Sequence, residues 1–267
     1  MYKGYRIRSD DVKLQGLLRK VDAEDIKADV PRGLADYLRS GGEFDGEKVE
    51  DKFFPTDMQF DVFISHFHRD ARLARKLAAY LQNTFKLRVF LDFQYWGCYT
   101  DLLAEIDRTW NYDKNYEKYG FNKGELLNHP KCTFSAAVMH MMLGIALARV
   151  IQSTECVIFV HSEQEKLTAS HKKRYEQIEL GSPWVYHELW MTELLAPSDR
   201  SSPRCGKITE AVNKSFDPRL NAPVNQLSYL DGNMIAKWEK KWEIEKNINE
   251  WGDKLSAGNA LDLLYGL

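Results

Sequence analysis

The sequence contains only four cysteines, Cys98, Cys132, Cys156 and Cys205, and no two of them form a C-x-x-C pair. Such a sparse and widely spaced set indicates neither a zinc site nor a disulfide framework. Free cysteines in a chain of this size suit the reducing cytosol. The N-terminal stretch MYKGYRIRSDDVKLQ also lacks the apolar run of a signal peptide. We therefore expect a cytoplasmic protein.

The sequence also lacks an excess of either charge, because its formal net charge is −2. No global basic field draws it to nucleic acid or to an anionic membrane, so neither is an expected partner. The most apolar window, 132–152, is interrupted by His140 and Arg149. Its unbroken part falls short of the roughly 20 residues that a membrane span needs, and we predict a buried helix there.

Several catalytic motifs are missing or broken. There is no G-x-G-x-x-G and no G-x-S-x-G, and CGKIT at 205–209 is an incomplete phosphate-binding loop. HELWM at 187–191 lacks the second histidine of a zinc-protease helix. HFHRDA at 66–71 has the H-x-H-x-D spacing of metallo-β-lactamase-type hydrolases, but Ala71 replaces the final histidine. We interpret it as two polar histidines in a strand-to-helix loop and expect no metal site.

Short apolar β-rich runs alternate with segments of helical periodicity between residues 60 and 195. This β-α-β-α-β-α order predicts an α/β fold, a flavodoxin-like open parallel sheet flanked by helices. In such sheets the binding crevice lies beyond the carboxyl ends of the strands. The expected strands are 60–65, 87–93 and 155–162, and the expected helices are 69–85, 102–110, 134–152 and 183–195, with a glycine-containing loop at 94–101.

The pattern divides the chain into three parts. Residues 1–57 are expected to be a helical N-terminal extension, with helices at 10–20 and 30–42. Residues 58–231 form the α/β domain, which carries an insertion at about 106–133 and a short strand at 227–231. Residues 232–267 form a C-terminal helical segment, in which Ile235, Trp238 and Trp242 share one face of a helix at 233–255 and are interpreted as packing residues.

The stretch GSPWVYHELW reads as the opening of a helix, with Ser182 as N-cap and Pro183 at the first helical position. Trp184 and Glu188 are four residues apart and share one helix face. Two interpretations are open. Either a core tryptophan lies beside a solvated glutamate, or Glu188 faces the crevice. Because this helix follows the third strand, it starts from the edge of the sheet where the crevice is expected.

Four stretches occur in an order that is typical of one family: FDVFISHFHRDARLARKLAAYL, VFLD, CVIFVHSE and SPWVYHEL. Together they resemble the Toll/interleukin-1 receptor (TIR) domain family, particularly its bacterial members. The resemblance covers about 58–110 and 134–195. The chain departs from the family in its insertion, in the missing proline beside Gly97 and in its fourth and fifth strands, which the resemblance does not locate.

The resemblance implies a set of site residues. Enzymatic members cleave NAD+ at the nicotinamide–ribose bond with the glutamate of a W-x-x-x-E helix, which is Glu188 here. NAD+ would be the substrate, and no cofactor is implied. Ser65 would line the pocket floor. The residues expected to bind or stack on the substrate are His66, Phe67, His68, Arg69, Asp92, Phe93, Trp96, Gly97 and Trp184.

The resemblance also implies a biological role, with one alternative. The first hypothesis is an NAD+-cleaving enzyme of bacterial antiphage immunity that makes a cyclic or conjugated ADP-ribose signal for a separate effector, as in Thoeris-type systems. The alternative is a non-catalytic interaction or adaptor module. Self-association is expected in both cases, through TIR surfaces that include the loop at 93–100. The aromatic insertion at 110–121 is an assembly surface or a lid, and the sequence leaves both open.

Overall fold

The computed structural model describes residues 3–22, 34–39, 44–53, 59–91, 93–162, 167–169, 176–180, 183–195, 220–224, 226–248 and 257–267. The chain divides into two compact units. The first, here called the sheet unit, comprises Met1–Ile26, Gln59–Leu91 and Ile151–Leu267. The second, the helical unit, comprises Lys27–Met58 and Asp92–Val150.

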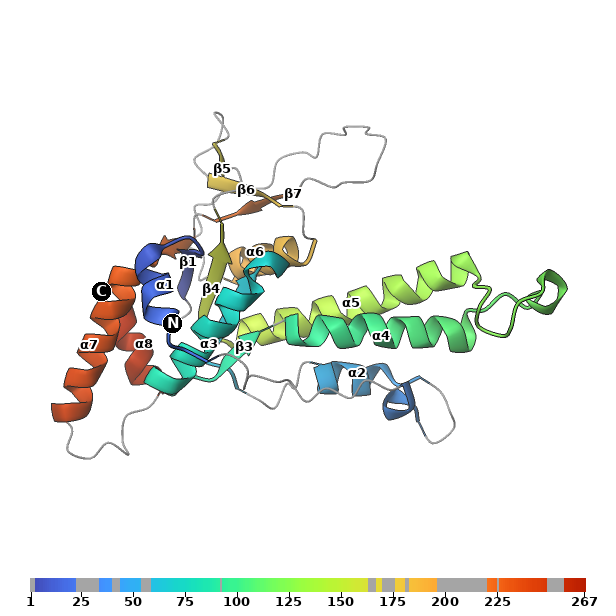
Figure 1. Ribbon diagram of the computed structural model, residues 1–267, viewed down its shortest axis with the longest axis horizontal. Helices are drawn as coiled ribbons and strands as arrows, with labels where there is room; N and C mark the ends of the chain where they lie inside the picture. The colour runs from blue at the N-terminus through green and yellow to red at the C-terminus, as the bar shows by residue number, and fades with distance from the viewer. Residues whose placement is uncertain are drawn as a thin grey trace. The chain divides into compact units, whose positions relative to one another are not determined.

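A five-stranded parallel sheet forms the centre of the sheet unit (Figure 1). The expected α/β architecture of a parallel sheet flanked by helices is therefore confirmed. Strands β2 and β4 are buried along their whole length, which explains why they read as continuous apolar runs rather than alternating ones. The spatial order is β3 (Val89–Leu91), β2 (Val62–His66), β4 (Cys156–His161), β1 (Lys3–Arg8) and β8 (Leu227–Tyr229).

Strand β1 corrects the expectation that residues 1–57 are a helical extension, since Lys3–Arg8 pairs with β4 on one side and β8 on the other. The sequence KGYRIR does not indicate an interior strand, because three of its six residues are basic and it contains no apolar run. The flavodoxin order 2-1-3-4-5 is matched when β2 is counted as the first strand. Then β1 fills the fourth place and β8 the fifth.

One face of the sheet is covered by a layer of helices: α1 (Val12–Leu18), α3 (Ala71–Phe85), α7 (Gly232–Ile248) and α8 (Ala257–Tyr265) (Figure 1). Trp238 on α7 is fully buried, stacks on Phe85 and donates its indole N–H to the Ala260 carbonyl at 2.7 Å. Asp11 accepts hydrogen bonds from Leu14 N of α1 and Gly232 N of α7, so one carboxylate caps two helices. The packing role expected for the α7 tryptophans is confirmed.

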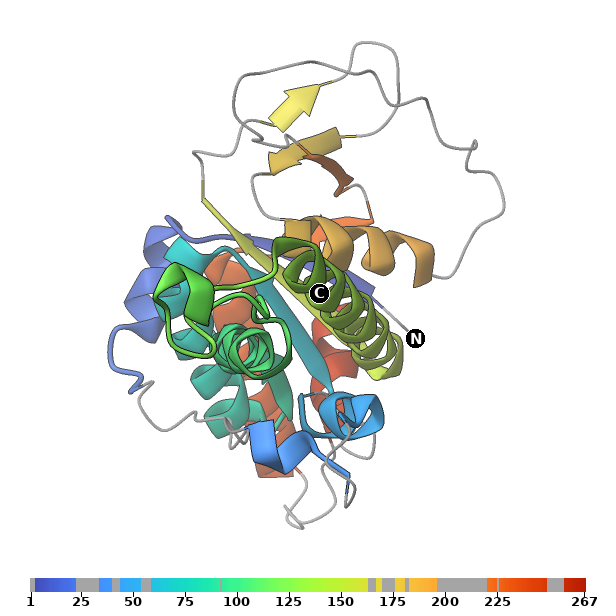
Figure 2. The same ribbon diagram turned by 90° about the vertical axis from the view of Figure 1, so that its right-hand side faces the viewer.

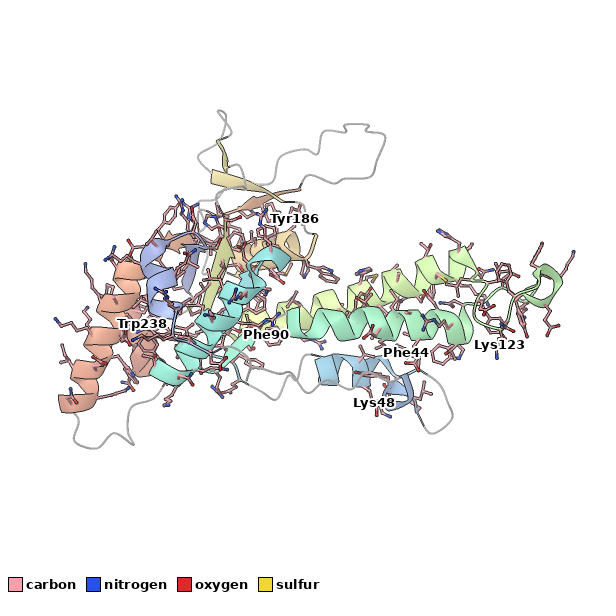
Figure 3. All side chains as sticks on the ribbon, in the orientation of Figure 1. Phe44, Lys48, Phe90, Lys123, Tyr186 and Trp238 are labelled. Carbon is pink, nitrogen blue, oxygen red and sulfur yellow. The ribbon has the colours of Figure 1, made fainter. Side chains whose placement is uncertain are left out.

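The opposite face of the sheet carries α6 (Pro183–Leu195), whose bounds match the expected helix. Figure 3 marks Tyr186 on α6 and Trp238 on α7, one residue from each layer. A second, antiparallel sheet lies beside α6 (Figure 2), and the sequence analysis missed it. Its strands are β5 (Leu167–Ala169), β6 (Glu176–Leu180) and β7 (Leu220–Pro223). Helix α6 thus packs between the main sheet and β7, with Val185 and Leu189 fully inside this core.

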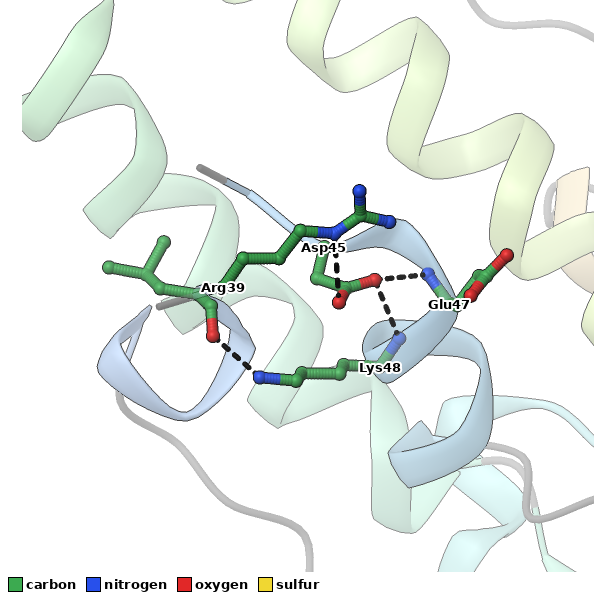
Figure 4. A network of polar contacts seen from close by, with 5 residues as sticks. Arg39, Asp45, Glu47 and Lys48 are labelled. Atoms are coloured by element: carbon green, nitrogen blue, oxygen red, sulfur yellow. Dashed lines mark hydrogen bonds and ion pairs between the residues drawn. The ribbon is translucent and has the colours of Figure 1, made fainter. Parts of the chain in front are cut away.

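The helical unit contains α2 (Gly46–Phe53), α4 (Phe93–Trp110), α5 (His129–Ser153, to Val150) and the short 3-10 helices at Leu34–Tyr37 and Glu117–Tyr119. Asp45 holds its N-terminal part together (Figure 4). The Asp45 carboxylate accepts from the backbone N–H groups of Glu47 and Lys48 at the start of α2 and from Arg39 Nε at 3.1 Å. The hydrogen bond from Arg39 is the chief reason that the Asp45 pKa lies below its ordinary value.

The loop expected at 94–101 is wrong, because α4 begins at Phe93 and this segment forms its first turns. A single glycine inside a helix costs only about 1 kcal/mol, which burial of Tyr99 and Leu102 on the same helix outweighs. The expected insertion at 106–133 comprises the end of α4, the connection with its 3-10 helix and the start of α5. The predicted helices at 30–42 and 233–255 lie partly outside the described residues.

Helix α5 has the length and apolar composition of a membrane span. No other helix in the described part of the chain has both, and 39% of the most apolar window of α5 is buried. Met139 and Leu143 are buried, whereas Phe134 and Met141 are exposed. The prediction of a buried helix is therefore confirmed for one face only.

Two glycines provide a matched test of the packing between α1 and α7. A Cβ at Gly232 would lie 2.6 Å from the Lys13 carbonyl carbon of α1, whereas a Cβ at Gly16 would meet nothing within 4 Å. We expect Gly232→Ala to lower the free energy of unfolding by about 1–3 kcal/mol through overpacking. Gly16→Ala should raise it by about 0.5–1 kcal/mol through helix propensity. Urea unfolding measures both, and equal effects of the two variants would contradict the α1–α7 contact.

Candidate functional site

Glu188 is the central residue of the candidate site. Pro183 starts α6, and the helix carries Glu188 inward so that its side chain is 0% exposed. The Ser65 hydroxyl, near the end of β2, donates a hydrogen bond to Glu188 Oε2 at 2.5 Å. A fully buried carboxylate is costly unless polar partners surround it. The interpretation of Glu188 as a solvated surface residue is therefore wrong, and its hydrogen bond to Ser65 places it against the main sheet. That Glu188 faces a binding crevice stays a prediction.

The parallel register places a row of side chains across the sheet beneath α6. Ser65 of β2 is paired with Phe159 of β4, which is paired with Arg6 of β1, which is paired with Tyr229 of β8. Paired residues in a parallel sheet point to the same face. Phe159 packs against Val185 and Leu189 of α6, so this is the face that α6 covers. The backbone of Arg6 lies two strands, roughly 10 Å, from that of Ser65.

The Arg6 side chain is itself unusual, because only 6% of the residue is exposed in a strand interior. Its guanidinium carbon lies 4.0 Å above the centre of the Tyr229 ring, an arrangement that stabilises a desolvated cation. A buried arginine and a buried carboxylate thus occupy one face of the sheet, separated by the aromatic ring of Phe159.

Two residues further along β4 and β1, the next row contains His161 and Arg8, at the carboxyl ends of their strands. The His161 ring stacks on Phe159 with 5.5 Å between ring centres, and only 4% of the residue is exposed. Burial lowers the pKa of His161 below its ordinary value, and the positive charges of Arg6 and Arg8 lower it further. His161 is therefore neutral near pH 7, with one ring nitrogen that donates a hydrogen bond and one that accepts.

Of the residues named from the sequence, Ser65, Phe67, Trp184 and Glu188 belong to this region. Ser65 contacts Glu188 directly, and Phe67 packs edge-on against Phe159 at 5.8 Å. Trp184 lies on α6, half-buried, one turn before Glu188. His66 is buried, but strand alternation points it to the opposite face of the sheet, toward the layer that contains α3. It therefore does not join the Glu188 group.

The other predicted site residues lie elsewhere or outside what the structure describes. Arg69, in the turn after β2, lines a groove toward α1, and its guanidinium carbon lies 5.4 Å from the centre of the Phe67 ring. Asp92 and the side chain of His68 lie outside the described residues. Phe93, Trp96 and Gly97 form the first turns of α4 in the helical unit, and their side chains also lie outside the described residues.

Sequence reasoning missed Arg6, Arg8 and His161 as members of the site. The signal for His161 was available, since it ends an expected strand of the sheet. The two arginines were not accessible, because they belong to a strand whose existence the N-terminal sequence does not indicate. Among the described residues, no group of three His, Cys, Asp or Glu side chains is arranged to hold a metal ion.

The site lies at the point where ligands usually bind in such sheets. In the flavodoxin-like order the direction of strand addition reverses between the strands that correspond to β2 and β4, and the crevice opens at their carboxyl ends. Ser65 and His161 come from these two strands. No protein-family model matches this chain, and comparison with curated proteins and with solved structures finds no match either.

The burial of His161 predicts a pH dependence of stability. Because its pKa is lowered in the folded state, the unfolded chain binds more protons at acidic pH. The contribution of His161 is present above the unfolded value of 6.5 and is lost as the pH falls toward the folded pKa. We expect His161→Gln to flatten the decline in unfolding free energy from about pH 7 to about pH 5.5. The exposed His129→Gln is the control, and identical slopes for wild type and His161→Gln would contradict the assignment.

Proposed function

We propose that this protein is a TIR-type enzyme that cleaves NAD+ at the nicotinamide–ribose bond. The observation that carries the proposal is the fully buried Glu188 carboxylate, held by the Ser65 hydroxyl at the carboxyl end of a parallel sheet. The resemblance of the SPWVYHEL helix to the W-x-x-x-E helix of the family is consistent with this geometry. The chemistry below depends on Glu188 and its neighbours alone.

The reaction needs a fixed negative charge more than it needs a strong acid. As the C1′–N bond breaks, its electron pair moves to the nicotinamide nitrogen, which leaves as a neutral ring. Positive charge develops on the ribose, and a carboxylate in a dry pocket stabilises it. Water or another nucleophile then bonds to C1′ and loses a proton. One carboxylate suffices, unlike in the glycosidases that need a pair.

The neighbours of Glu188 suit the remainder of such a substrate. The hydrogen bond from the Ser65 hydroxyl to Oε2 fixes the orientation of the Glu188 carboxylate. Phe67, which is half-buried, offers an aromatic ring for stacking with nicotinamide. Arg6 supplies positive charge two strands away, at a separation that suits a group of the substrate remote from the scissile bond.

The biological role proposed here is the one the resemblance implies. The product is an ADP-ribose derivative, cyclic or conjugated, that signals to a separate effector during antiphage defence in the cytoplasm. Self-association is part of the proposal. The exposed apolar residues of α5, which include Phe134, Met141 and Ile145, supply a surface for it.

Glu188→Gln tests the catalytic role directly. The amide keeps the shape and can still accept the Ser65 hydrogen bond, but it removes the charge. We expect nicotinamide release from NAD+ to fall at least about a hundredfold. The matched control is Glu193→Gln on the same helix, a half-buried glutamate whose pKa burial raises, and it should retain activity. Mass spectrometry of the products at high protein concentration measures both. A wild type that releases no nicotinamide would support the adaptor alternative instead.

Ser65→Ala separates positioning from charge. The variant keeps the Glu188 carboxylate but loses the hydrogen bond that orients it. Because hydrogen bonds to charged groups contribute about 1.5–3 kcal/mol, the rate should fall about ten- to hundredfold. Ser65→Thr keeps the hydroxyl and should recover part of the rate. If Ser65→Ala is as active as wild type, Ser65 does not orient the catalytic carboxylate.

A further inference from the structure

An open groove of about 490 Å³ lies at the carboxyl edge of the sheet, between α1 and the start of α3. Its volume falls within the roughly 300–1,000 Å³ of ligand-binding pockets. All of its lining residues belong to the sheet unit. Four of them are cationic and two are anionic: Arg19, Arg69, Arg72 and Lys76 against Asp10 and Asp70.

Each carboxylate of the groove has a cationic neighbour, although Asp70 Oδ2 accepts no hydrogen bond from the described residues. Asp10 forms a two-pronged ion pair with Arg8 from outside the groove, with contacts of 2.6 and 2.9 Å. Asp70 lies 3.8 Å from Arg69. Lys76 donates to the Leu18 carbonyl at 3.2 Å, which fixes its ammonium on the groove wall. In the described part of the chain no carboxylate is paired with Arg19 or Arg72, so the groove carries positive charge that its own acids do not balance.

The start of α3 adds to this positive field. The helix has fifteen residues, and Asp70 at its N-cap makes no side-chain hydrogen bond to the first turn. The N–H groups of that turn therefore have no side-chain cap, and they carry the positive end of the helix dipole. Arg72 and Leu73 belong to this first turn and also line the groove. Side-chain cations and the start of α3 thus border one open volume.

We propose that this groove binds the diphosphate group of a nucleotide. Guanidinium groups bind phosphate oxygens in a two-pronged manner, and a helix N-terminus with free N–H groups favours the same ligand. The apolar side chains of Leu18 and Leu73 lie in the same groove and offer contact to the uncharged part of the nucleotide. The diphosphate has two possible sources, the NAD+ of the proposed reaction or a separate nucleotide. The binding itself does not depend on the proposed activity.

The experiment measures the affinity of the full-length protein for ADP and for inorganic pyrophosphate by isothermal titration calorimetry. The test variant is Arg19→Ala with Arg72→Ala. The matched control is Lys240→Ala with Lys241→Ala, which removes the same charge from exposed positions of α7. We expect the arginine pair to weaken binding at least about tenfold. The lysine pair should bind as wild type does, and affinity should fall with added salt. Thermal unfolding of all three proteins confirms that they are equally folded.

The source of the diphosphate is settled by a second arm, the KM for NAD+ of the same variants. If the arginine pair raises the KM while kcat is kept, the groove holds the diphosphate of the substrate. If ADP binding is lost but the KM is unchanged, or if the wild type binds ADP without cleaving NAD+, the groove serves a separate nucleotide. Both results support the proposal. It is overturned if wild type binds neither ADP nor pyrophosphate at millimolar concentration, or if the arginine pair binds them as tightly as wild type.

Discussion

The burial of the Glu188 carboxylate is the constraint on which the rest of the site depends. A charged group removed from water needs polar neighbours, and the sheet supplies them through its register. The hydroxyl of Ser65 bonds the carboxylate, and Arg6 lies on the same face of the sheet, two strands away. A shift of one residue in any of these strands would turn its polar side chains to the opposite face. The register of the sheet and the chemistry of the site are therefore specified together.

The N-terminal strand has a similar double role. β1 joins β4 to β8, so without it the sheet would be split between its third and fifth positions. The same strand buries Tyr5 and Ile7 against one helical layer and directs Arg6 and Arg8 toward the other face. Counted from β2, strand β1 occupies the fourth place of the flavodoxin order, and its register puts Arg6 and Arg8 on the face that α6 covers. The order of the sheet and the two cations on this face therefore share one origin in the sequence KGYRIR.

The sequence predicted most of the central fold because β2, β3, β4, α3 and α6 carry strong local patterns. Strands buried on both faces read as apolar runs, and Ser182-Pro183 signals a helix start. Where prediction failed, tertiary contacts outweighed local signals. β1 is stabilised by its two neighbours rather than by its own composition, and Gly97 is accommodated in α4 by packing of the following turns. Glu188 was found through its motif, whereas Arg6 and Arg8 depend on a strand that only the folded sheet reveals.

In the proposed function, NAD+ binds on the face of the sheet beneath α6, with its scissile bond at Glu188. A crystal structure of Glu188→Gln soaked with NAD+ tests this most directly, because the variant should bind the substrate without turning it over. We expect the nicotinamide ribose within hydrogen-bond distance of residue 188, with an aromatic ring of the substrate stacked on Phe67. NAD+ bound elsewhere on the molecule, or no NAD+ bound at saturating concentration, would contradict it.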